Sequence, residues 1–398
     1  MLRGADVFAP GILCAGGAVA AGRTVAVWAD LGGATTLARG RSLLRWRVEP
    51  GRKRRLLACG TALQPRAQML GAAPSGVAVE ILYRAHAHAD MPPLDRVLAH
   101  VEEADPALRR CLYPQNAPSA VAALVLAPEP SEAVLDMCAA PGGKSLQLAR
   151  RLTGARGVLV AVDKSRSKCA SLASLCDAVL GEGHNVRVVP GDSGKLLLAA
   201  APAAAKPRPG LTRGGAFGGK LGLLTDTSVR GTLASATVLS DGTRKVKGFG
   251  KGSFDRVLLD GPCSALGQRP RLALDATHVD MPGFAKVQKR LLRTAAALCK
   301  SGGVLVYSTC TVSPLENERL VADALRSPAD VFDGGTTLAL DDARAHVPQG
   351  CGGPGLPGFG LTDDERARVL RWGPGSAAAE AEDSIGFFVA RFVVNHVG

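Results

Sequence analysis

The chain has 398 residues, enough for two domains, because a single hydrophobic core rarely grows beyond about 250–300 residues. Apolar residues make up 46% but occur in short runs broken by charge, glycine or proline, which argues against a membrane-spanning helix or a cleavable signal peptide and favours a cytoplasmic protein. A formal net charge of +13 favours a polyanionic partner such as nucleic acid, although many basic proteins bind none.

None of the ten cysteines has the C-x-x-C spacing that is typical of zinc sites and thioredoxin-like sites. We therefore expect no structural metal, and we expect most of the thiols to be small core residues. Only cysteines in loops that follow strands are candidates for chemistry.

Residues 1–88 contain short β-prone runs, Thr24–Trp28 and Val77–Leu82, separated by turn residues, and this pattern predicts a small β-rich domain. The basic cluster Arg52–Arg55 within it is either a phosphate contact or a solvated loop. Residues 89–120 are expected to form a connecting segment.

Residues 121–398 alternate strands with helices, the pattern of a mostly parallel sheet covered on both faces, so we expect a Rossmann-like α/β domain. The expected strands cover 134–136, 158–163, 186–189, 254–260, 303–309 and 385–393, the last of which can take an antiparallel position. The expected helices cover 143–152, a stretch ending at 180, and about 284–300. Two stretches, about 200–252 and 340–382, lack either period and are predicted to be flexible insertions. The first is a passive surface loop or an RNA-contacting arm.

A glycine-rich loop, Asp136-Met-Cys-Ala-Ala-Pro-Gly-Gly-Lys-Ser145, joins the first of these strands to its helix, at the sheet edge where ligands bind. Gly142 and Gly143 let the backbone approach a ligand closely, and the helix N-terminus offers amides to a carboxylate. The loop matches neither G-x-G-x-x-G nor G-x-x-x-x-G-K-[ST], which disfavours dinucleotides and nucleotide phosphates. We therefore favour S-adenosylmethionine as the cofactor.

Acidic residues stand at or just after the ends of the following strands. Asp163 is expected to bind both ribose hydroxyls, Asp192 is expected to face the adenine edge, and Asp260 ends the next strand. One such acid alone is more often a helix cap or a turn former. Their succession, together with the glycine-rich loop, predicts a cofactor pocket.

Two cysteines follow strands of the same sheet, Cys263 in Asp-Gly-Pro-Cys and Cys310 in Tyr-Ser-Thr-Cys. Each alone is more simply interpreted as a buried small residue. Together they suit methylation of cytosine C5, in which a thiolate adds to C6, C5 accepts a methyl group, and a base removes the C5 proton so that the thiol can leave. Asp260 can stabilise the adduct near N3, and Lys144 can balance charge and position the base.

These motifs resemble those of the Sun-domain RNA cytosine-5 methyltransferases, whose marks include Cys138-Ala-Ala-Pro-Gly-Gly-Lys144, Asp260-x-Pro-Cys263 and Ser308-Thr-Cys310. The resemblance covers the chain from about residue 110 and implies that Cys310 is the nucleophile and that Cys263 serves product release. It also implies cofactor contacts by Cys138, Ala139, Ala140, Pro141, Gly142, Gly143, Lys144, Asp163, Asp192 and Asp260.

A closer resemblance is to the sixth animal member of that family, a PUA-containing enzyme that modifies a cytosine at the 3′ end of the tRNA acceptor stem. It is carried by Ser264–Pro270, Val304–Thr311, Asp383–Phe388 and, less specifically, Arg3–Ile12. It implies that residues 1–88 form a PUA-like RNA-binding domain, N-terminally incomplete, that grips the acceptor stem and CCA end of tRNA. The chain departs from that member at Gly261, where alanine is usual, and in the insertion at 200–252.

Two other classes of protein stay open on sequence grounds. A catalytically weak or inactive tRNA-binding protein would retain the fold, but the intact Cys310, Cys263, Lys144 and Asp260 argue against it. A DNA cytosine methyltransferase attacks with the Pro-Cys thiol and needs no Thr-Cys partner, so the paired cysteines favour RNA as the substrate. A monomer is the default expectation.

Overall fold

The computed structural model divides into two units, each of which is described by itself. The described residues up to Leu112 form the N-terminal unit, and those from Tyr113 onward form the C-terminal unit. The described ranges are 6–31, 39–40, 54–84, 94–105, 112–154, 157–181, 183–198, 236–238, 244–246, 248–268, 281–326, 328–332, 335–373 and 384–396.

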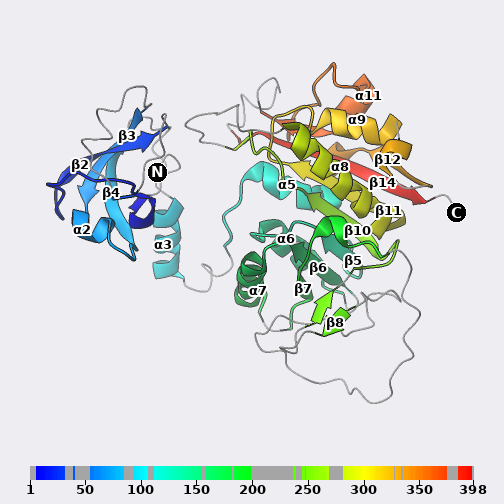
Figure 1. Ribbon diagram of the computed structural model, residues 1–398. Coiled ribbons are helices and arrows are strands. Elements are labelled where there is room, and N and C mark those ends of the chain that lie inside the picture. Colours follow the sequence, from blue (N-terminus) through cyan, green and yellow to red (C-terminus); the bar gives the residue numbers. More distant parts are fainter. Residues whose placement is uncertain are drawn as a thin grey trace, which may run out of the picture. The chain divides into compact units, whose positions relative to one another are not determined.

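The N-terminal unit is built on a four-stranded antiparallel sheet with the order β1-β4-β3-β2 (Figure 1). Its strands are β1 (Val7–Phe8), β2 (Thr24–Asp30), β3 (Arg54–Ala62) and β4 (Val77–Arg84), and its helical segments are η1 (Ala9–Gly11), α2 (Arg66–Met69) and α3 (Leu94–Ala104). Both strands predicted here are confirmed. Small and aliphatic side chains form its core: Val7, Ala9, Leu57, Ala58, Ala62, Met69, Ala78, Val79 and Ile81.

The basic cluster of the N-terminal unit is not wholly a loop. Arg54 and Arg55 belong to β3, where they pair with Asp30 and Ala29 of β2. The loop interpretation is wrong for these two arginines, because the leucines that follow them draw the strand into the sheet and extend the pairing backwards. Arg52 and Lys53 lie outside the described residues.

The C-terminal unit contains a mixed sheet with the order β12-β14-β11-β10-β5-β6-β7, in which β13 also pairs with β14. The parallel strands are β5 (Ala133–Asp136), β6 (Val158–Asp163), β7 (Val186–Pro190), β10 (Phe254–Asp260) and β11 (Cys299–Thr309). The antiparallel pairs involve β12 (Thr336–Asp341), β13 (Leu370–Trp372) and β14 (Phe387–His396). The predicted parallel sheet and its late antiparallel strand are both confirmed.

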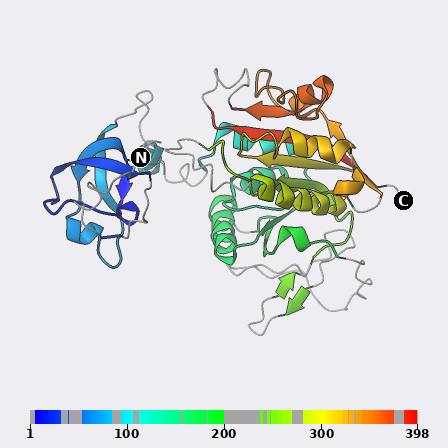
Figure 2. The same ribbon diagram turned by 45° about the horizontal axis from the view of Figure 1, so that its top comes forward.

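Helices cover both faces of this sheet (Figures 1 and 2). Helices α5 (Ala117–Leu126), α6 (Gly143–Arg151) and α7 (Arg166–Leu180) pack on one face, whereas α8 (Met281–Leu298) and α9 (Glu318–Arg326), followed by the short α10 (Pro328–Val331), pack on the other. No helix in the described part of the chain combines the length and the apolar character that crossing a bilayer requires. Helices on both faces of a mostly parallel sheet form the Rossmann-like α/β arrangement that the sequence predicted.

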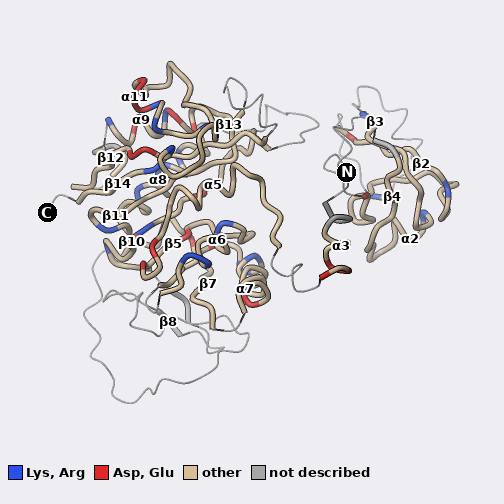
Figure 3. Tube along the Cα trace, turned by 180° about the vertical axis from the view of Figure 1, so that it is seen from behind, with Lys and Arg blue, Asp and Glu red and all other residues tan. Residues whose placement is uncertain are grey.

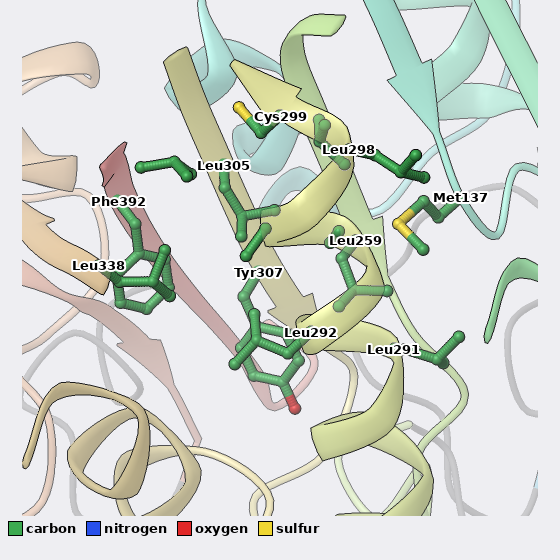
Figure 4. Close-up of a cluster of buried hydrophobic side chains, with 14 of the residues drawn as sticks. Met137, Leu259, Leu291, Leu292, Leu298, Cys299, Leu305, Tyr307, Leu338 and Phe392 are labelled. Atoms are coloured by element: carbon green, nitrogen blue, oxygen red, sulfur yellow. The ribbon is translucent and has the colours of Figure 1, made fainter. Parts of the chain in front are cut away.

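Alternate residues of the central strands supply the two cores. Leu135 and Leu259 face α8, whereas their neighbours Val134 and Leu258 belong to the core on the opposite face. Figure 4 shows the first of these cores, where Leu259, Leu292, Tyr307 and Phe392 are brought together from β10, α8, β11 and β14. Each large side chain buried in this way contributes roughly 1.5–3 kcal/mol, so this packing fixes where the strands end.

The first predicted insertion ends earlier than the sequence pattern indicated. Phe249 is buried, its ring centroid lies 5.0 Å from that of Phe254, and its backbone bonds to Leu196 and Leu198. Residues 248–250 are thus buried with the core, because one aromatic side chain anchors an otherwise glycine-rich run, whereas Lys251 is exposed. The short strands β8 (Ala236–Val238) and β9 (Arg244–Val246) form a hairpin, and residues 199–235 lie outside the described ones.

The second predicted insertion contains regular elements and buried side chains, so the expectation of a flexible stretch without them is wrong for residues 340–373. Residues 340–373 contain the end of β12, the 3-10 turn η4 (Ala343–His346), helix α11 (Asp363–Arg368) and strand β13. Thr362 and Glu365 form a capping box at the start of α11, and Trp372 is buried edge-on against Phe387 at a centroid distance of 6.4 Å. A few anchors therefore order a stretch whose glycines and prolines hide any period. Residues 374–383 lie outside the described ones.

A buried ion pair fastens this stretch to the rest of the unit. Arg371 donates from Nη1 to both carboxylate oxygens of Glu318, at 2.8 and 3.0 Å, and neither side chain is more than 1% exposed. Arg371 also donates from Nη2 to the carbonyl of Val312 at 2.6 Å. Removing one partner of such a pair leaves an uncompensated charge in a dry interior.

We predict that Arg371→Ala lowers the free energy of unfolding by about 3–5 kcal/mol, because Glu318 is left buried without its countercharge. The matched control is Arg319→Ala, which removes an arginine 60% exposed from its pair with Asp323 and should cost less than about 1 kcal/mol. Urea denaturation followed by circular dichroism measures both changes. Equal losses in the two variants would contradict the anchoring role.

Candidate active site

The predicted site residues lie at the carboxyl edge of the parallel strands. Asp136, Asp163 and Asp260 are the last residues of β5, β6 and β10, and Cys310 directly follows β11. The chain runs outward from β5 to β6 and β7 and then returns to β10 on the other side of β5. The junction between β5 and β10 is therefore the switch point of the sheet, where open α/β sheets bind their ligands.

The glycine-rich loop is held against helix α7. Gly142 has a φ of +121°, and a Cβ there would lie 2.5 Å from Leu172 and 3.0 Å from Leu175. Ala139 donates its amide to the carbonyl of Val162 at 2.9 Å, so the loop crosses the end of β6. Residues 138–144 thus lie over the strand ends, and Gly142 is required by the packing of the loop as well as by its turn.

Cys138 lies within the electrostatic influence of four carboxylates. Burial raises the pKa of this thiol, and the charges of Asp136, Asp260, Asp163 and Asp192 raise that pKa further. The three acids predicted to bind the cofactor, Asp163, Asp192 and Asp260, therefore act on one thiol together with Asp136, and their negative charge suits a cationic ligand.

Asp163 and Asp192 also cap local turns, as single acids at strand ends often do. Asp163 accepts from the amide of Ser165 at 2.9 Å, and Asp192 accepts from the amide of Gly194 at 3.1 Å, both through Oδ1. These bonds fix the direction of the two side chains. The capping role and a ligand-binding role are thus compatible.

Asp136 lies beneath the loop and is fully buried. Ser145 donates to its Oδ2 at 2.7 Å, and burial is the largest cause that raises the pKa of Asp136 to about 6. The bond ties the end of β5 to the first turn of α6. Asp136 therefore supports the loop from below.

Lys144 and Asp260 form the polar centre of the site. The Lys144 ammonium donates to Asp260 Oδ2 at 2.7 Å and to Ser119 Oγ at 2.6 Å, and it lies 5.3 Å from the centre of the Phe387 ring. Ser308 donates to the other oxygen of Asp260, Oδ1, at 2.7 Å. Both carboxylate oxygens are thus oriented, and Asp260, whose side chain is 26% exposed, points a fixed carboxylate toward the edge of the sheet.

The two predicted catalytic cysteines are in contact. Their Sγ atoms lie 3.3 Å apart, and both residues are partly buried. The hydrogen bond from Cys263 is the largest cause that lowers the pKa of Cys310 to about 7, and the same bond holds the pKa of Cys263 well above its usual range. The two thiols can therefore share one proton, and we expect Cys263 to keep that proton when Cys310 ionises.

Several residues that support the site were not predicted. Gly267 donates its amide to the carbonyl of Cys310 at 3.0 Å, and a Cβ at Gly267 would lie 2.1 Å from the carbonyl oxygen of Gly386. The side chains of Gln288, Glu316 and Asn317 bond to the loops that carry the two cysteines. The one signal in the sequence was the polar run Glu316-Asn317-Glu318 directly before an amphipathic helix. Within the described residues, no three His, Cys, Asp or Glu side chains are grouped to hold a metal ion.

The segments that carry these residues match a known protein family. The 16S rRNA methyltransferase RsmB/F family matches residues 123–198 and 220–347, more than half of the chain. The mouse protein tRNA (cytosine(72)-C(5))-methyltransferase NSUN6 is 31% identical over 99% of this chain and 72% of its own length. The chain belongs to the Sun-domain RNA cytosine-5 methyltransferase family. It is therefore an RNA cytosine-5 methyltransferase by descent, as its motifs predicted.

Other relatives of this methyltransferase family extend the comparison. The Arabidopsis thaliana protein rRNA (cytosine-C(5))-methyltransferase NOP2C is 30% identical over 99% of this chain and 71% of its own length. The crystal structure of NSun6 from Pyrococcus horikoshii with SFG, an S-adenosylmethionine analogue, has a TM-score of 0.56 at 24% identity and covers 98% of this chain and 72% of that one. This likeness confirms the class I methyltransferase fold, and the family implies the use of S-adenosylmethionine.

The shared proton predicts how Cys310 reacts with iodoacetamide. Because only the thiolate is alkylated, the rate should rise with pH through a midpoint near 7 and then level off. In Cys263→Ala the donor is lost, so the midpoint should move up toward the ordinary value of 9.0, and the rate at pH 7 should fall at least about tenfold. Peptide mass spectrometry follows the modification of Cys310.

The control for this experiment is Cys59→Ala, which removes a thiol of strand β3 in the N-terminal unit. It should leave the pH midpoint of Cys310 unchanged. A midpoint that is the same in Cys263→Ala as in the wild type would contradict the shared proton.

Proposed function

We propose that the chain methylates C5 of cytosine in RNA, with Cys310 as the nucleophile and Cys263 assisting release. The observation that carries this proposal is the 3.3 Å contact between the two thiols beside the Lys144–Asp260 pair. A packing role for the cysteines needs no such contact. A nucleophile and its partner at one sheet edge do need it.

In the proposed reaction the Cys310 thiolate forms a bond to C6 of the base, and electron density moves to C5. Asp260 is held by Lys144 and Ser308, and it can stabilise the adduct by passing a proton to N3 as electron density builds on the ring, while Lys144 balances the charge left on the carboxylate. C5 then gains the methyl group. Loss of the C5 proton to a base returns the electron pair to the ring and breaks the bond between C6 and Cys310, with Cys263 assisting that step.

S-adenosylmethionine would supply the methyl group from its sulfonium. The charge of the site suits such a ligand because the four carboxylates that act on Cys138 favour a positive charge. We assign its contacts to residues 138–144 and to Asp163, Asp192 and Asp260, with Asp163 toward the ribose hydroxyls and Asp192 toward the adenine.

We propose tRNA as the substrate, at a cytosine near the 3′ end of the acceptor stem. The mouse relative, named for cytosine 72 of tRNA, matches almost the whole chain, including the part that precedes the catalytic unit. The N-terminal unit would then act as a PUA-like RNA-binding domain that contacts the acceptor stem and the CCA end. In the view of Figure 3 basic and acidic segments alternate over the C-terminal unit, so the net charge does not by itself mark the RNA surface there. We also propose that the protein acts as a monomer in the cytoplasm.

The division of labour between the cysteines is tested with a labelled RNA transcript and S-adenosylmethionine. Cys310→Ala should lose methylation and form no covalent complex, because no thiolate reaches C6. Cys263→Ala should form a complex that survives denaturing electrophoresis and migrates as a slow band, because release is blocked. The opposite pattern would reverse the two roles.

The substrate is tested by bisulfite sequencing of total tRNA and ribosomal RNA incubated with the protein and S-adenosylmethionine. We expect new 5-methylcytosine near the 3′ end of the acceptor stem and none in the Cys310→Ala control. Methylation confined to ribosomal RNA would overturn the tRNA assignment and favour the activity for which the Arabidopsis relative is named. Binding of tRNA without methylation would instead favour an inactive tRNA-binding protein.

A further inference from the structure

Two adjacent polar residues, Glu316 and Asn317, lie beneath the loops that carry the catalytic cysteines. Both side chains are fully buried, although they belong to a turn that precedes α9. Burying a carboxylate costs several kcal/mol unless hydrogen bonds compensate it, so the partners of Glu316 indicate what the charge is used for.

The partners of Glu316 flank Cys263. Ser264 donates its amide to Glu316 Oε2 at 3.0 Å and its hydroxyl to Oε1 at 2.5 Å. Gln288, from α8, donates to Glu316 Oε2 at 2.8 Å and to the carbonyl of Pro262 at 3.0 Å. Ser264 is thereby bonded to the Glu316 carboxylate, and Pro262 is bonded to the Gln288 amide that also contacts this carboxylate.

The partners of Asn317 flank Cys310 in the same way. Thr309 donates its hydroxyl to Asn317 Oδ1 at 2.6 Å, and Asn317 donates from Nδ2 to the carbonyl of Thr311 at 3.0 Å. Every polar atom of the asparagine side chain is thus bonded to the residue before or the residue after Cys310.

Cross-links join these two sets of bonds. The hydroxyls of Ser264 and Thr311 lie 2.8 Å apart, and Tyr307 donates from β11 to the carbonyl of Glu316 at 2.7 Å. All four side chains are buried, so water does not compete with these bonds. The dipeptide therefore bonds to both loops, and the loops also contact each other directly through Ser264 and Thr311.

We propose that Glu316 and Asn317 are positioning residues that hold the Cys263 and Cys310 thiols at contact distance. The inference rests on the proposed function, since it assigns these residues to the same two-cysteine site. Glu316 with Gln288 fixes the Cys263 loop, and Asn317 fixes the Cys310 loop. The covalent bond between residues 316 and 317 then fixes one loop against the other. A displacement of about 1 Å at a reacting group can slow a reaction about 100-fold, so the dipeptide acts on the chemical step without touching the RNA.

The sharpest test uses Thr309, whose hydroxyl is the group that bonds to Asn317. Thr309→Val keeps the shape and removes the hydroxyl, whereas Thr309→Ser keeps the hydroxyl. In Thr309→Val we expect kcat to fall about 10- to 100-fold with KM for RNA unchanged within about twofold, and we expect the pH midpoint of Cys310 alkylation to rise. Thr309→Ser should restore both quantities to near the wild-type values.

Glu316→Gln tests the other half of the dipeptide. The amide offers one acceptor where three donors converge, so the Cys263 loop should loosen, and Cys310 should again alkylate with a higher pH midpoint. The matched control is Glu132→Gln, which weakens a bond to Arg256 at the opposite end of β10 and should leave that midpoint unchanged. Thermal unfolding identifies variants that do not fold. If Glu316→Gln is one of them, Ser264→Ala takes its place.

The alkylation profile requires no substrate, so it separates this inference from the proposed function. Suppose that the wild-type protein methylates no RNA, but that the pH midpoint of Cys310 alkylation rises in Thr309→Val. The proposed function would then be wrong, and the positioning role would be supported. Folded Thr309→Val and Glu316→Gln variants with the wild-type midpoint and the wild-type kcat would overturn the positioning role itself.

Discussion

The parallel pairing of β5, β10 and β11 is the constraint on which the rest of the site depends. Asp260 pairs with Ser308, so β10 and β11 end side by side, and Asp136, the last residue of β5, pairs with Leu258 close to that end. Three loops leave the sheet at this edge, and they carry the glycine-rich segment, Cys263 and Cys310. Because helices cover both faces, the strand ends cannot shift without disturbing two cores. Hydrophobic packing on both faces of the sheet therefore fixes the positions of the three loops that carry the site residues.

Much of this arrangement follows from the sequence. Short apolar runs that alternate with helical stretches predict parallel strands. Because the carboxyl ends of such strands lie at one edge of the sheet, Asp136, Asp163, Asp260 and Cys310 are expected to lie near one another. The bonds that orient those side chains do not follow in the same way. Nothing in the spacing of Lys144 and Ser308 indicates that each takes a different oxygen of Asp260. Pairing between side chains far apart in the chain is set by tertiary packing, which no local pattern encodes.

The two stretches that were wrongly predicted to be flexible insertions share a physical cause. Residues 340–373 and 248–252 have the glycine and proline content of loops, yet each is fixed by one or two large side chains, Trp372 in the first and Phe249 in the second. Periodicity detects a face of many apolar residues, whereas a single buried aromatic ring leaves no period. The buried pair of Arg371 and Glu318 could not be predicted for a different reason, because charged residues are ordinarily expected to lie on the surface.

The run Glu316-Asn317-Glu318 ties three parts of the unit to one short piece of backbone: the Cys263 loop, the Cys310 loop and strand β13. Side chains around it can change as long as their donors and acceptors are kept. The length of the chain from Thr311 to Glu316 cannot change, because one added or deleted residue would turn all three side chains away from their partners at once. During evolution this segment should therefore accept substitutions but reject insertions and deletions.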